Sequence, residues 1–258
     1  MNEPTEAEVE RRCNVILKQL EDGKSPDSNE LKFLISTNVL LRNFRNPDDG
    51  SIGKFAAAMM ENVNRKQCVI SAEKCEIVPG ETILEIGTGS HGYSFEVLLK
   101  TKGLKKLVGV EISDSMRDQV SQKFSTEIKT KDLIVVGTDC KDLKEIFPKD
   151  ESVDCILAIN VVYFLHPLRE YLKEMYRVLK PCTGRILLSC KESVRDLAPA
   201  TDEKDTVFHN VDFDHISTLC KEEGFQVTTE RIDCEKVSMV SKVSTISDDF
   251  ILIKLCKI

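Results

Sequence analysis

The sequence has no apolar run long enough to cross a membrane as a helix. Its longest apolar stretch, Cys155 to Leu165, is interrupted by Asn160 and is better explained as a buried strand. The first ten residues, MNEPTEAEVE, are acidic where a signal peptide is basic and then apolar, and no N-x-S/T sequon occurs. We therefore expect no membrane span and a cytoplasmic location, with entry into the nucleus left open.

The sequence also has no C-x-x-C pair and no surplus of basic residues. Its ten cysteines lie mostly within apolar patterns, so we expect buried reduced thiols instead of a disulfide scaffold. Cys68 and Cys75 are seven positions apart, but no neighbouring histidine completes a ligand set, and no metal site is predicted. The net charge of −7 provides no attraction toward nucleic acid. These features favour a small molecule as the partner and leave the oligomeric state open.

No linker rich in Pro, Gly or Ser divides the 258 residues, and a content of 41% apolar and 31% charged residues is typical of a globular protein. The first eighty residues show helical periodicity alone, whereas strand-like runs appear only after them. We divide it into an N-terminal helical extension, residues 1–64, and a main domain, residues 65–258. Helices are expected over Ala7 to Leu20, from Asp27-Ser-Asn-Glu30 through Leu31 to Leu40, over Ile52 to about Asn62, and over Arg65 to Ile77.

The stretch Thr82 to Phe95, TILEIGTGSHGYSF, predicts a strand, a glycine loop and a helix. A Pro79-Gly80 turn precedes the apolar, β-branched run. The glycines at 87, 89 and 92 allow positive φ and let a ligand approach the backbone at a helix N-terminus. The spacing G-x-G-x-x-G is a weak signal by itself, because glycine turns are common between strands and helices.

A second predicted strand, Leu107 to Val110, strengthens this interpretation because an acidic residue follows it directly. Glu111 stands nineteen positions after Gly92. An acidic residue at this place can accept both hydroxyl protons of a ribose. The two patterns together predict a site for a nucleotide-type cofactor.

From Ile83 onward, strand-like and helical runs alternate, which predicts a mostly parallel sheet with helices on both faces. The last two strand-like runs, Phe225 to Ile232 and Phe250 to Leu255, have no convincing crossover helix between them and should pair antiparallel. The intervening elements are expected at Phe95 to Lys100, Leu107 to Val110, Ser115 to Phe124, Leu133 to Val136, Val153 to Ile159, Leu168 to Leu179 and Arg185 to Ser189.

Four separate motifs resemble those of class I S-adenosylmethionine-dependent methyltransferases, in the same order and with similar spacing. The resemblance covers about Pro79 to Cys190 and is closest to small-molecule enzymes of the ubiquinone/menaquinone type. It implies an α/β fold with a Rossmann-like, doubly wound, seven-stranded sheet whose final strand is antiparallel. The motifs are Glu85-Ile-Gly87-Thr88-Gly89, Leu107-Val-Gly-Val-Glu111-Ile112-Ser-Asp-Ser-Met116, Val136-Gly-Thr-Asp139-Cys140-Lys-Asp-Leu143 and Arg177-Val-Leu-Lys-Pro181.

The resemblance implies S-adenosylmethionine as the cofactor and in-line transfer of its methyl group to a small-molecule acceptor. It places Glu111 at the ribose hydroxyls, Asp139 at the adenine, and Asn160 with the first two glycines at the methionine part. Tyr163 and His166 follow the fourth strand and are expected to contact the acceptor. No catalytic residue is assigned, because aligning donor and acceptor can provide much of the acceleration. The expected cofactor-binding residues are Glu85, Gly87, Thr88, Gly89, Gly92, Glu111, Ile112, Asp139, Cys140 and Asn160.

The sequence departs from the family pattern at His91, where a third glycine is usual, and at Pro181-Cys-Thr-Gly184, where the turn is one residue longer. Two other functions stay open at this point. Tyr176 and Lys180 have the Tyr-x-x-x-Lys spacing of a nicotinamide-dependent oxidoreductase, although Pro181 places Lys180 at a helix end. A cofactor-binding regulatory or scaffold protein would keep the fold without turnover. The resemblance also implies that the helices before Arg65 cover the cofactor as a lid.

Overall fold

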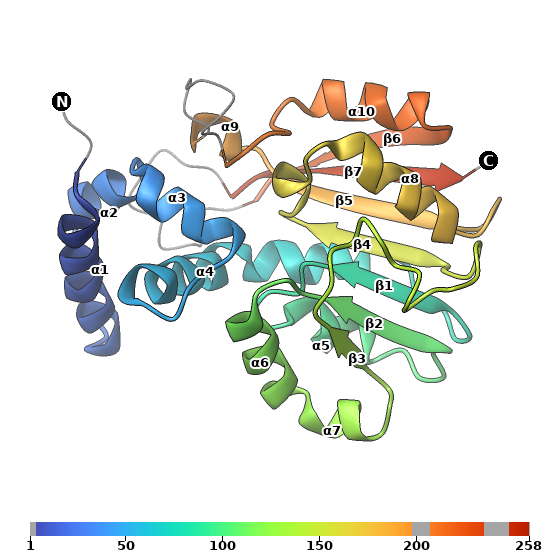
Figure 1. Ribbon diagram of the computed structural model, residues 1–258, viewed down its shortest axis with the longest axis horizontal. Coiled ribbons are helices and arrows are strands. Elements are labelled where there is room, and N and C mark those ends of the chain that lie inside the picture. The colour runs from blue at the N-terminus through green and yellow to red at the C-terminus, as the bar shows by residue number, and fades with distance from the viewer. Residues whose placement is uncertain (1–3, 198–206, 235–247, 258) are drawn as a thin grey trace.

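The computed structural model describes residues 4–197, 207–234 and 248–257 (Figure 1). A group of four helices precedes a seven-stranded sheet with further helices. The helices are α1 (Glu6–Glu21), α2 (Ser28–Ile35), α3 (Asn38–Arg45), α4 (Ser51–Glu73), α5 (Tyr93–Leu98), α6 (Asp114–Lys123), α7 (Ser125–Lys129), η1 (Val162–Phe164), α8 (Leu168–Val178), α9 (Val194–Leu197) and α10 (Phe213–Glu222). The strands are β1 (Thr82–Ile86), β2 (Lys106–Val110), β3 (Ile134–Val136), β4 (Cys155–Ile159), β5 (Arg185–Lys191), β6 (Phe225–Ile232) and β7 (Phe250–Lys257).

The sheet has the strand order β3-β2-β1-β4-β5-β7-β6. Strands β1 to β5 pair in parallel, and β7 lies between β5 and β6 and is antiparallel to both. The order reverses between β1 and β4, which is the position where open α/β sheets bind ligands. The predicted fold class is confirmed, including the antiparallel pairing of the last two strands.

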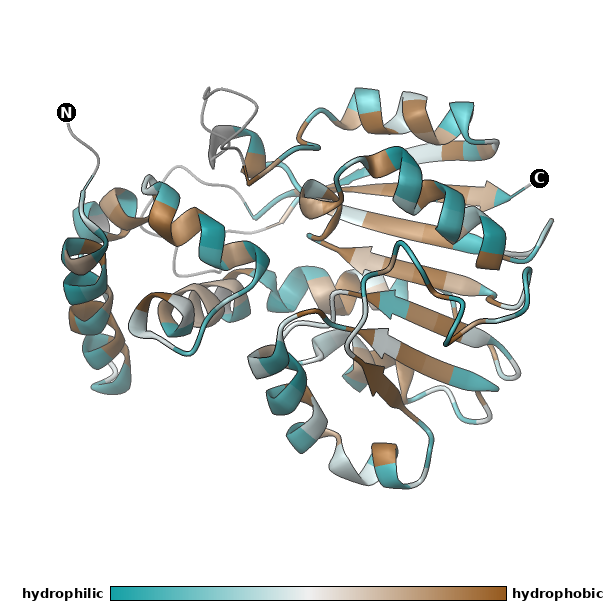
Figure 2. Ribbon diagram, viewed as in Figure 1, coloured by the Kyte–Doolittle hydropathy of each residue, from teal (hydrophilic) through white to brown (hydrophobic). Residues whose placement is uncertain are grey.

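Each face of the sheet is buried under its own layer of helices. One face, with Leu84 and Ile156, packs against α8, α10 and the loop before β4. The other, with Ile83 and Leu157, packs against α5, α6 and the end of α4. Because both faces are covered, the central strands are mostly apolar, and β4 is apolar along its whole length, as Figure 2 shows.

The N-terminal helices have a hydrophobic cluster of their own, contributed by α1, α2, α3 and the first half of α4. Figure 1 shows this group beyond the carboxyl ends of the parallel strands. The second half of α4 packs on the sheet through Ala72. The clusters change over within α4, between Met59 and Ala72, and the division at residues 64 and 65 stays a prediction.

Two local predictions were wrong, and one helix was missed. The two helices expected on either side of residue 64 are one continuous helix, α4, because no glycine or proline interrupts the chain there. The single helix expected after Asp27 is instead two helices, because Thr37 caps α3 by accepting a hydrogen bond from the backbone N–H of Leu40. Helix α10 was not predicted, although Asp212 caps it and three of its apolar residues have helical spacing.

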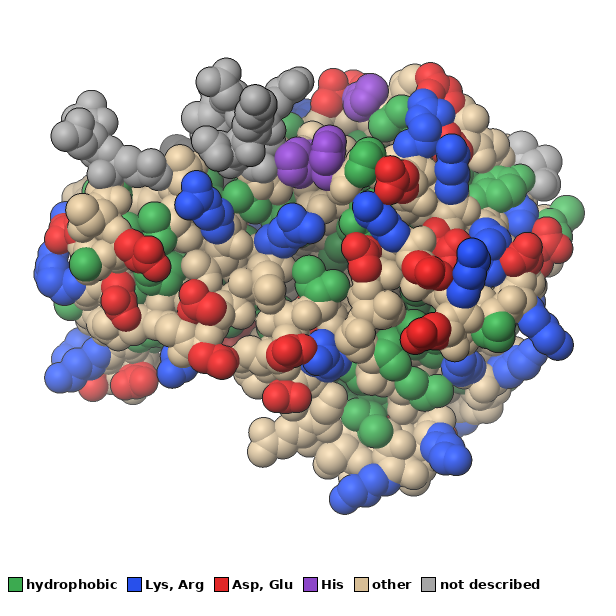
Figure 3. Space-filling view, in the orientation of Figure 1, with side chains coloured by type: hydrophobic (Ala, Val, Ile, Leu, Met, Phe, Trp, Pro, Cys, Tyr) green, Lys and Arg blue, Asp and Glu red, His purple; other side chains and the backbone are tan. Residues whose placement is uncertain are grey.

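Charged side chains of both signs are interspersed over the face in Figure 3. Within the described part of the chain, no helix combines the length and the apolar character needed to cross a membrane.

Candidate functional site

The glycine loop after β1 forms one wall of the candidate site. The backbone N–H of Gly87 donates to the carbonyl of Val110 at 2.7 Å, which ties the loop to β2. Gly87 has φ +73°, and a Cβ there would lie 2.3 Å from Cγ2 of Val161. Gly89 has φ +64°, but nothing lies within 4 Å of the place where its Cβ would be. Its backbone is therefore open to the adjoining cavity, where a ligand can approach it.

Glu111 at the end of β2 closes onto this loop. Its Oε2 accepts a hydrogen bond from the backbone N–H of Gly89, and its Oε1 accepts one from the N–H of Ser113, each at 2.9 Å. Burial raises the pKa of this carboxyl, and the two backbone hydrogen bonds oppose that rise. The carboxylate keeps lone pairs beyond these two hydrogen bonds, so it can also accept hydroxyl protons.

Glu85 lies in β1 beneath the loop and is 2% exposed. Both of its carboxylate oxygens accept from Oγ of Ser94, at 2.5 and 2.6 Å, which connects β1 to the first turn of α5. Burial raises the pKa of Glu85 to about 8; the neighbouring Glu111 adds to the rise and the Ser94 hydrogen bond opposes it. A cation bound in the cavity would favour the ionised form.

Asp139 and Cys140 follow β3 at the far end of the cavity. The hydroxyl of Tyr171 on α8 donates to Oδ2 of Asp139 at 3.4 Å, and the backbone N–H of Lys141 donates to its Oδ1 at 3.0 Å. Cys140 is buried. The loop after β3 is thus held against α8.

Asn160, directly after β4, is the centre of a hydrogen-bond network with α4. Its Nδ2 donates to Oδ1 of Asn64 at 3.0 Å and to Oε1 of Gln67 at 2.9 Å. Nε2 of Gln67 donates to Oδ1 of Asn160 at 3.1 Å and to Oγ of Ser189 at 2.8 Å. The hydroxyl of Tyr163 also donates to Oδ1 of Asn160, at 3.1 Å. The network fixes α4 over the carboxyl ends of β4 and β5.

His91 makes a second connection between the loop and α4. Its Nε2 lies 3.2 Å from Oε1 of Glu61, its Nδ1 lies 2.7 Å from Oγ of Ser90, and its ring stacks on Tyr93. The hydroxyl of Tyr93 donates to the same Glu61 oxygen at 2.8 Å. His91, which stands where a third glycine is usual, therefore lines the cavity and contacts Glu61 on α4, the helix that covers the loop.

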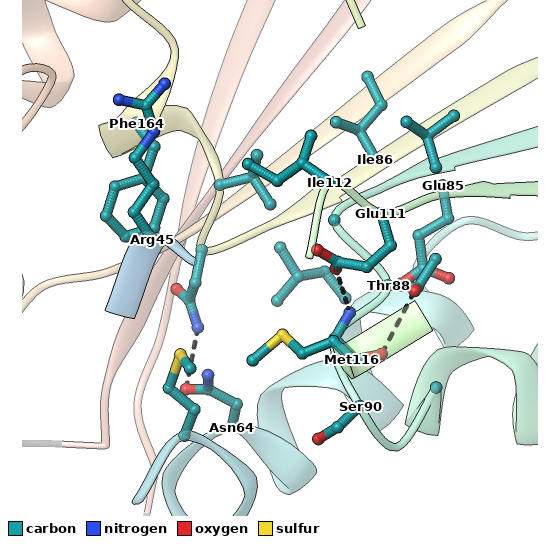
Figure 4. A pocket seen from close by; sticks show the side chains of 18 of the residues that line it. Arg45, Asn64, Glu85, Ile86, Thr88, Ser90, Glu111, Ile112, Met116 and Phe164 are labelled. Atoms are coloured by element: carbon teal, nitrogen blue, oxygen red, sulfur yellow. Dashed lines mark hydrogen bonds between the residues drawn. The ribbon is translucent and has the colours of Figure 1, made fainter. Parts of the chain in front are cut away.

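These groups surround one cavity of about 170 Å³, of which Figure 4 shows part. All ten residues expected at the cofactor line it. Its described lining contains four acids, Glu61, Glu85, Glu111 and Asp139, but besides His91 a single basic residue, Arg45.

The two residues expected at the acceptor, Tyr163 and His166, do not line this larger cavity. Tyr163 is buried and lines a second, smaller cavity next to the first, where its hydroxyl is also hydrogen-bonded to the backbone of Lys191. His166 lines neither cavity: it is exposed and stacks on His209 with ring centroids 4.2 Å apart. The structure therefore does not bring His166 to the site.

Several residues of the lining were missed in the sequence. Met60, Glu61, Asn64 and Cys68 come from α4, where successive helical turns place them on one side. That stripe was hidden because the sequence interpretation divided α4 at residue 64. Phe44 and Arg45, at the end of α3, carry no local signal that distinguishes them from other helix-end residues.

The oxidoreductase alternative is not supported. Nζ of Lys180 lies 2.6 Å from Oδ1 of Asp154, which precedes β4, and the ring of Tyr176 packs on Phe225 at the start of β6. Both contacts are at the amino ends of the strands, opposite the cavity.

Residues 84–188 match a family model described as a methyltransferase domain. Two curated relatives are similar over part of the chain. The ubiquinone/menaquinone biosynthesis C-methyltransferase UbiE of Geotalea daltonii is 25% identical over 49% of this chain and 52% of its own. The sterol 4-C-methyltransferase strm-1 of Caenorhabditis elegans is 26% identical over 65% of this chain and 46% of its own. The chain spans about half the length of these relatives.

Solved structures share the fold at low sequence identity. A Haemonchus contortus phosphoethanolamine N-methyltransferase 2, in complex with phosphomonomethylethanolamine and S-adenosylhomocysteine, matches with a TM-score of 0.62 at 14% identity, covering 84% of this chain and 60% of that one. A Haloferax volcanii putative methyltransferase, bound to the Trm112 activator, matches with a TM-score of 0.59 at 20% identity, covering 78% and 94%. With the matched domain, the motif order and the seven-stranded sheet in agreement, residues 84–188 are a methyltransferase domain, and the fold is that of the class I S-adenosylmethionine-dependent methyltransferases.

Proposed function

We propose that the chain binds S-adenosylmethionine in the larger cavity and transfers its methyl group to a small-molecule acceptor. The hydrogen bond from the N–H of Gly89 to Glu111 carries this proposal. In a dinucleotide fold, the loop amides receive a pyrophosphate. Here a carboxylate already occupies that donor, and a second acid, Glu85, lies buried below it. An anionic pyrophosphate is disfavoured, whereas a cationic sulfonium with a ribose suits this lining.

Within this proposal, each part of the cofactor has its own residues. Glu111 accepts the ribose hydroxyl protons, and Asp139 with the Cys140 backbone contacts the adenine. Gly89 lets the methionine part approach the loop backbone, beside Asn160, and Gly87, Thr88 and Gly92 form the rest of that loop. Ile112, which is 47% exposed, contributes apolar surface at the cavity edge. Glu85 is the last of the ten residues proposed to bind the cofactor, and it lies buried beneath the loop.

When bound, S-adenosylmethionine supplies an activated methyl group on a positively charged sulfur. The chain needs only to hold the acceptor in line with that group and to keep water away, which can provide much of the acceleration. A general base is needed only if the acceptor must lose a proton before it attacks.

A transfer assay with methyl-labelled cofactor tests the proposal. The protein is incubated with pooled small metabolites, and the label is followed into the small-molecule and macromolecular fractions separately. We expect label in the small-molecule fraction with the wild type and little with Glu111→Ala. Label found only in protein or nucleic acid would contradict a small acceptor.

A further inference from the structure

A smaller cavity of about 100 Å³ adjoins the one proposed for the cofactor. Phe44, Met60, Asn64, Asn160 and Phe164 line both, so the two spaces meet beyond the end of β4. We call this second space the side chamber. Its walls come from the N-terminal helices on one side and from the segments after β4 and β5 on the other.

The walls of the side chamber are mainly apolar. Ile35, Met59 and Val63 project from α2 and α4, and Val194 and Phe208 lie opposite. Three aromatic rings gather there: the centroid of Phe208 is 5.3 Å from that of Phe164 and 6.1 Å from that of Tyr163. Rings at such separations make favourable contacts with one another, and a further ring or apolar group beside them would be removed from water.

Lys191 is the one charged side chain among the described residues that line the side chamber, and its charge is compensated. Its Nζ donates to the carbonyl of Val63 at 2.8 Å and to Oδ1 of Asp248 at 3.3 Å. The side chains of Lys191 and Asp248 are each 5% exposed. A phosphate, carboxylate or ammonium placed here would lose its hydration without gaining a free partner, which is costly.

A polar group remains where the two cavities meet. Oδ1 of Asn64 accepts from Asn160, but Nδ2 of Asn64 has no hydrogen-bond partner among the described residues. It can donate to a hydroxyl or carbonyl oxygen of a molecule that spans the junction.

We propose that the side chamber holds the apolar body of an uncharged methyl acceptor, with its reacting atom directed past Asn64 and Asn160 toward the larger cavity. The proposal rests on the proposed function, and it limits the acceptor class to uncharged, apolar molecules. Charged head groups are excluded by the same contacts, because Lys191 is already paired with Asp248.

Indole is a suitable probe, because it is uncharged and apolar and the chain contains no tryptophan to mask its fluorescence. Indole is titrated into the full chain in the presence of S-adenosylhomocysteine, and a blue shift of its emission reports an apolar site. We expect a saturable shift that choline and phosphocholine do not reverse. Displacement by either charged compound, or no saturable shift, would overturn the proposal.

Val63→Phe fills the side chamber without changing the backbone carbonyl that Lys191 contacts. We expect its dissociation constant for indole to rise about tenfold, because an added ring leaves too little space. The matched control is Val15→Phe, on α1, where the valine is 50% exposed and lines neither cavity. An unchanged constant in Val63→Phe would place indole elsewhere.

S-adenosylhomocysteine affinity, measured on the same samples, separates this proposal from the function on which it rests. Unchanged affinity in Val63→Phe, with weaker indole binding, supports the side chamber. Failure of the wild type to bind the sulfur compound would contradict the proposed function, while the indole titration without it would still show whether the chamber takes an apolar molecule.

Discussion

Glu111 connects the structure of the glycine loop with ligand binding, because its carboxylate bonds to the loop and is also proposed to accept from the ribose. We expect Glu111→Ala to weaken S-adenosylhomocysteine binding by roughly 1.5–3 kcal/mol, the range of hydrogen bonds to a charged group. Titration calorimetry measures the affinity, and circular dichroism checks that the sheet persists. An unchanged affinity in a folded variant would remove Glu111 from the proposed site.

The buried carboxyl of Glu85 predicts that the free energy of unfolding depends on pH. Its pKa in the folded chain is about 8, above the ordinary 4.5, because burial disfavours the charge. Between these values the folded state holds a proton that the unfolded state releases, so the free energy of unfolding falls as pH rises, by up to about 1.4 kcal/mol per pH unit. Glu85→Gln carries no such proton.

Urea unfolding of wild type and Glu85→Gln, at several pH values across that window, checks this expectation. The wild type should lose stability relative to the variant as the pH increases. Parallel pH profiles for the two proteins would mean that Glu85 is ionised throughout the window in the folded chain.

At the scale of elements, α4 joins the extension to the sheet, and Gln67 is buried at that junction. Gln67→Leu leaves the polar atoms of Asn160 and Ser189 with fewer partners, so we expect a loss of about 1–3 kcal/mol in the free energy of unfolding. Gln122→Leu, at an exposed position of α6, should change it by less than about 0.5 kcal/mol. Urea unfolding compares the two, and equal effects would argue against a stabilising network.

The contact between Glu61 on α4 and His91 in the glycine loop should contribute less to the free energy of unfolding than the Gln67 network does. Glu61 and His91 are both partly exposed, so a double-mutant cycle with Glu61→Ala and His91→Ala should give a coupling of about 0.2–1 kcal/mol. Additive losses in urea unfolding would mean that the contact contributes nothing.

His91→Gly should bind S-adenosylhomocysteine within a few-fold of wild type in titration calorimetry, because His91 lines the cavity but is not one of the ten residues proposed to contact the cofactor. A much weaker affinity in the folded variant would mean that His91 contacts the cofactor.

At the scale of the whole molecule, the sheet could be predicted because its strands alternate with helices and end antiparallel. The ten expected cofactor residues come together because all except Glu85, which lies within β1, follow a parallel strand, and the carboxyl ends of parallel strands share one edge. The side chamber could not be predicted in this way. Met59, Val63 and Phe208 come together only through the tertiary contacts of α4. No sequence pattern indicates that Lys191 donates a hydrogen bond to the backbone carbonyl of Val63.

The central claim is that the larger cavity takes a sulfonium nucleoside and not a dinucleotide. Titration calorimetry of the full chain with S-adenosylmethionine, S-adenosylhomocysteine and NAD tests it most directly. We predict saturable binding of both sulfur compounds and none of NAD at the same concentrations, because Glu111 occupies the loop amide that a pyrophosphate would need. Saturable binding of NAD, with no heat from either sulfur compound, would contradict the account.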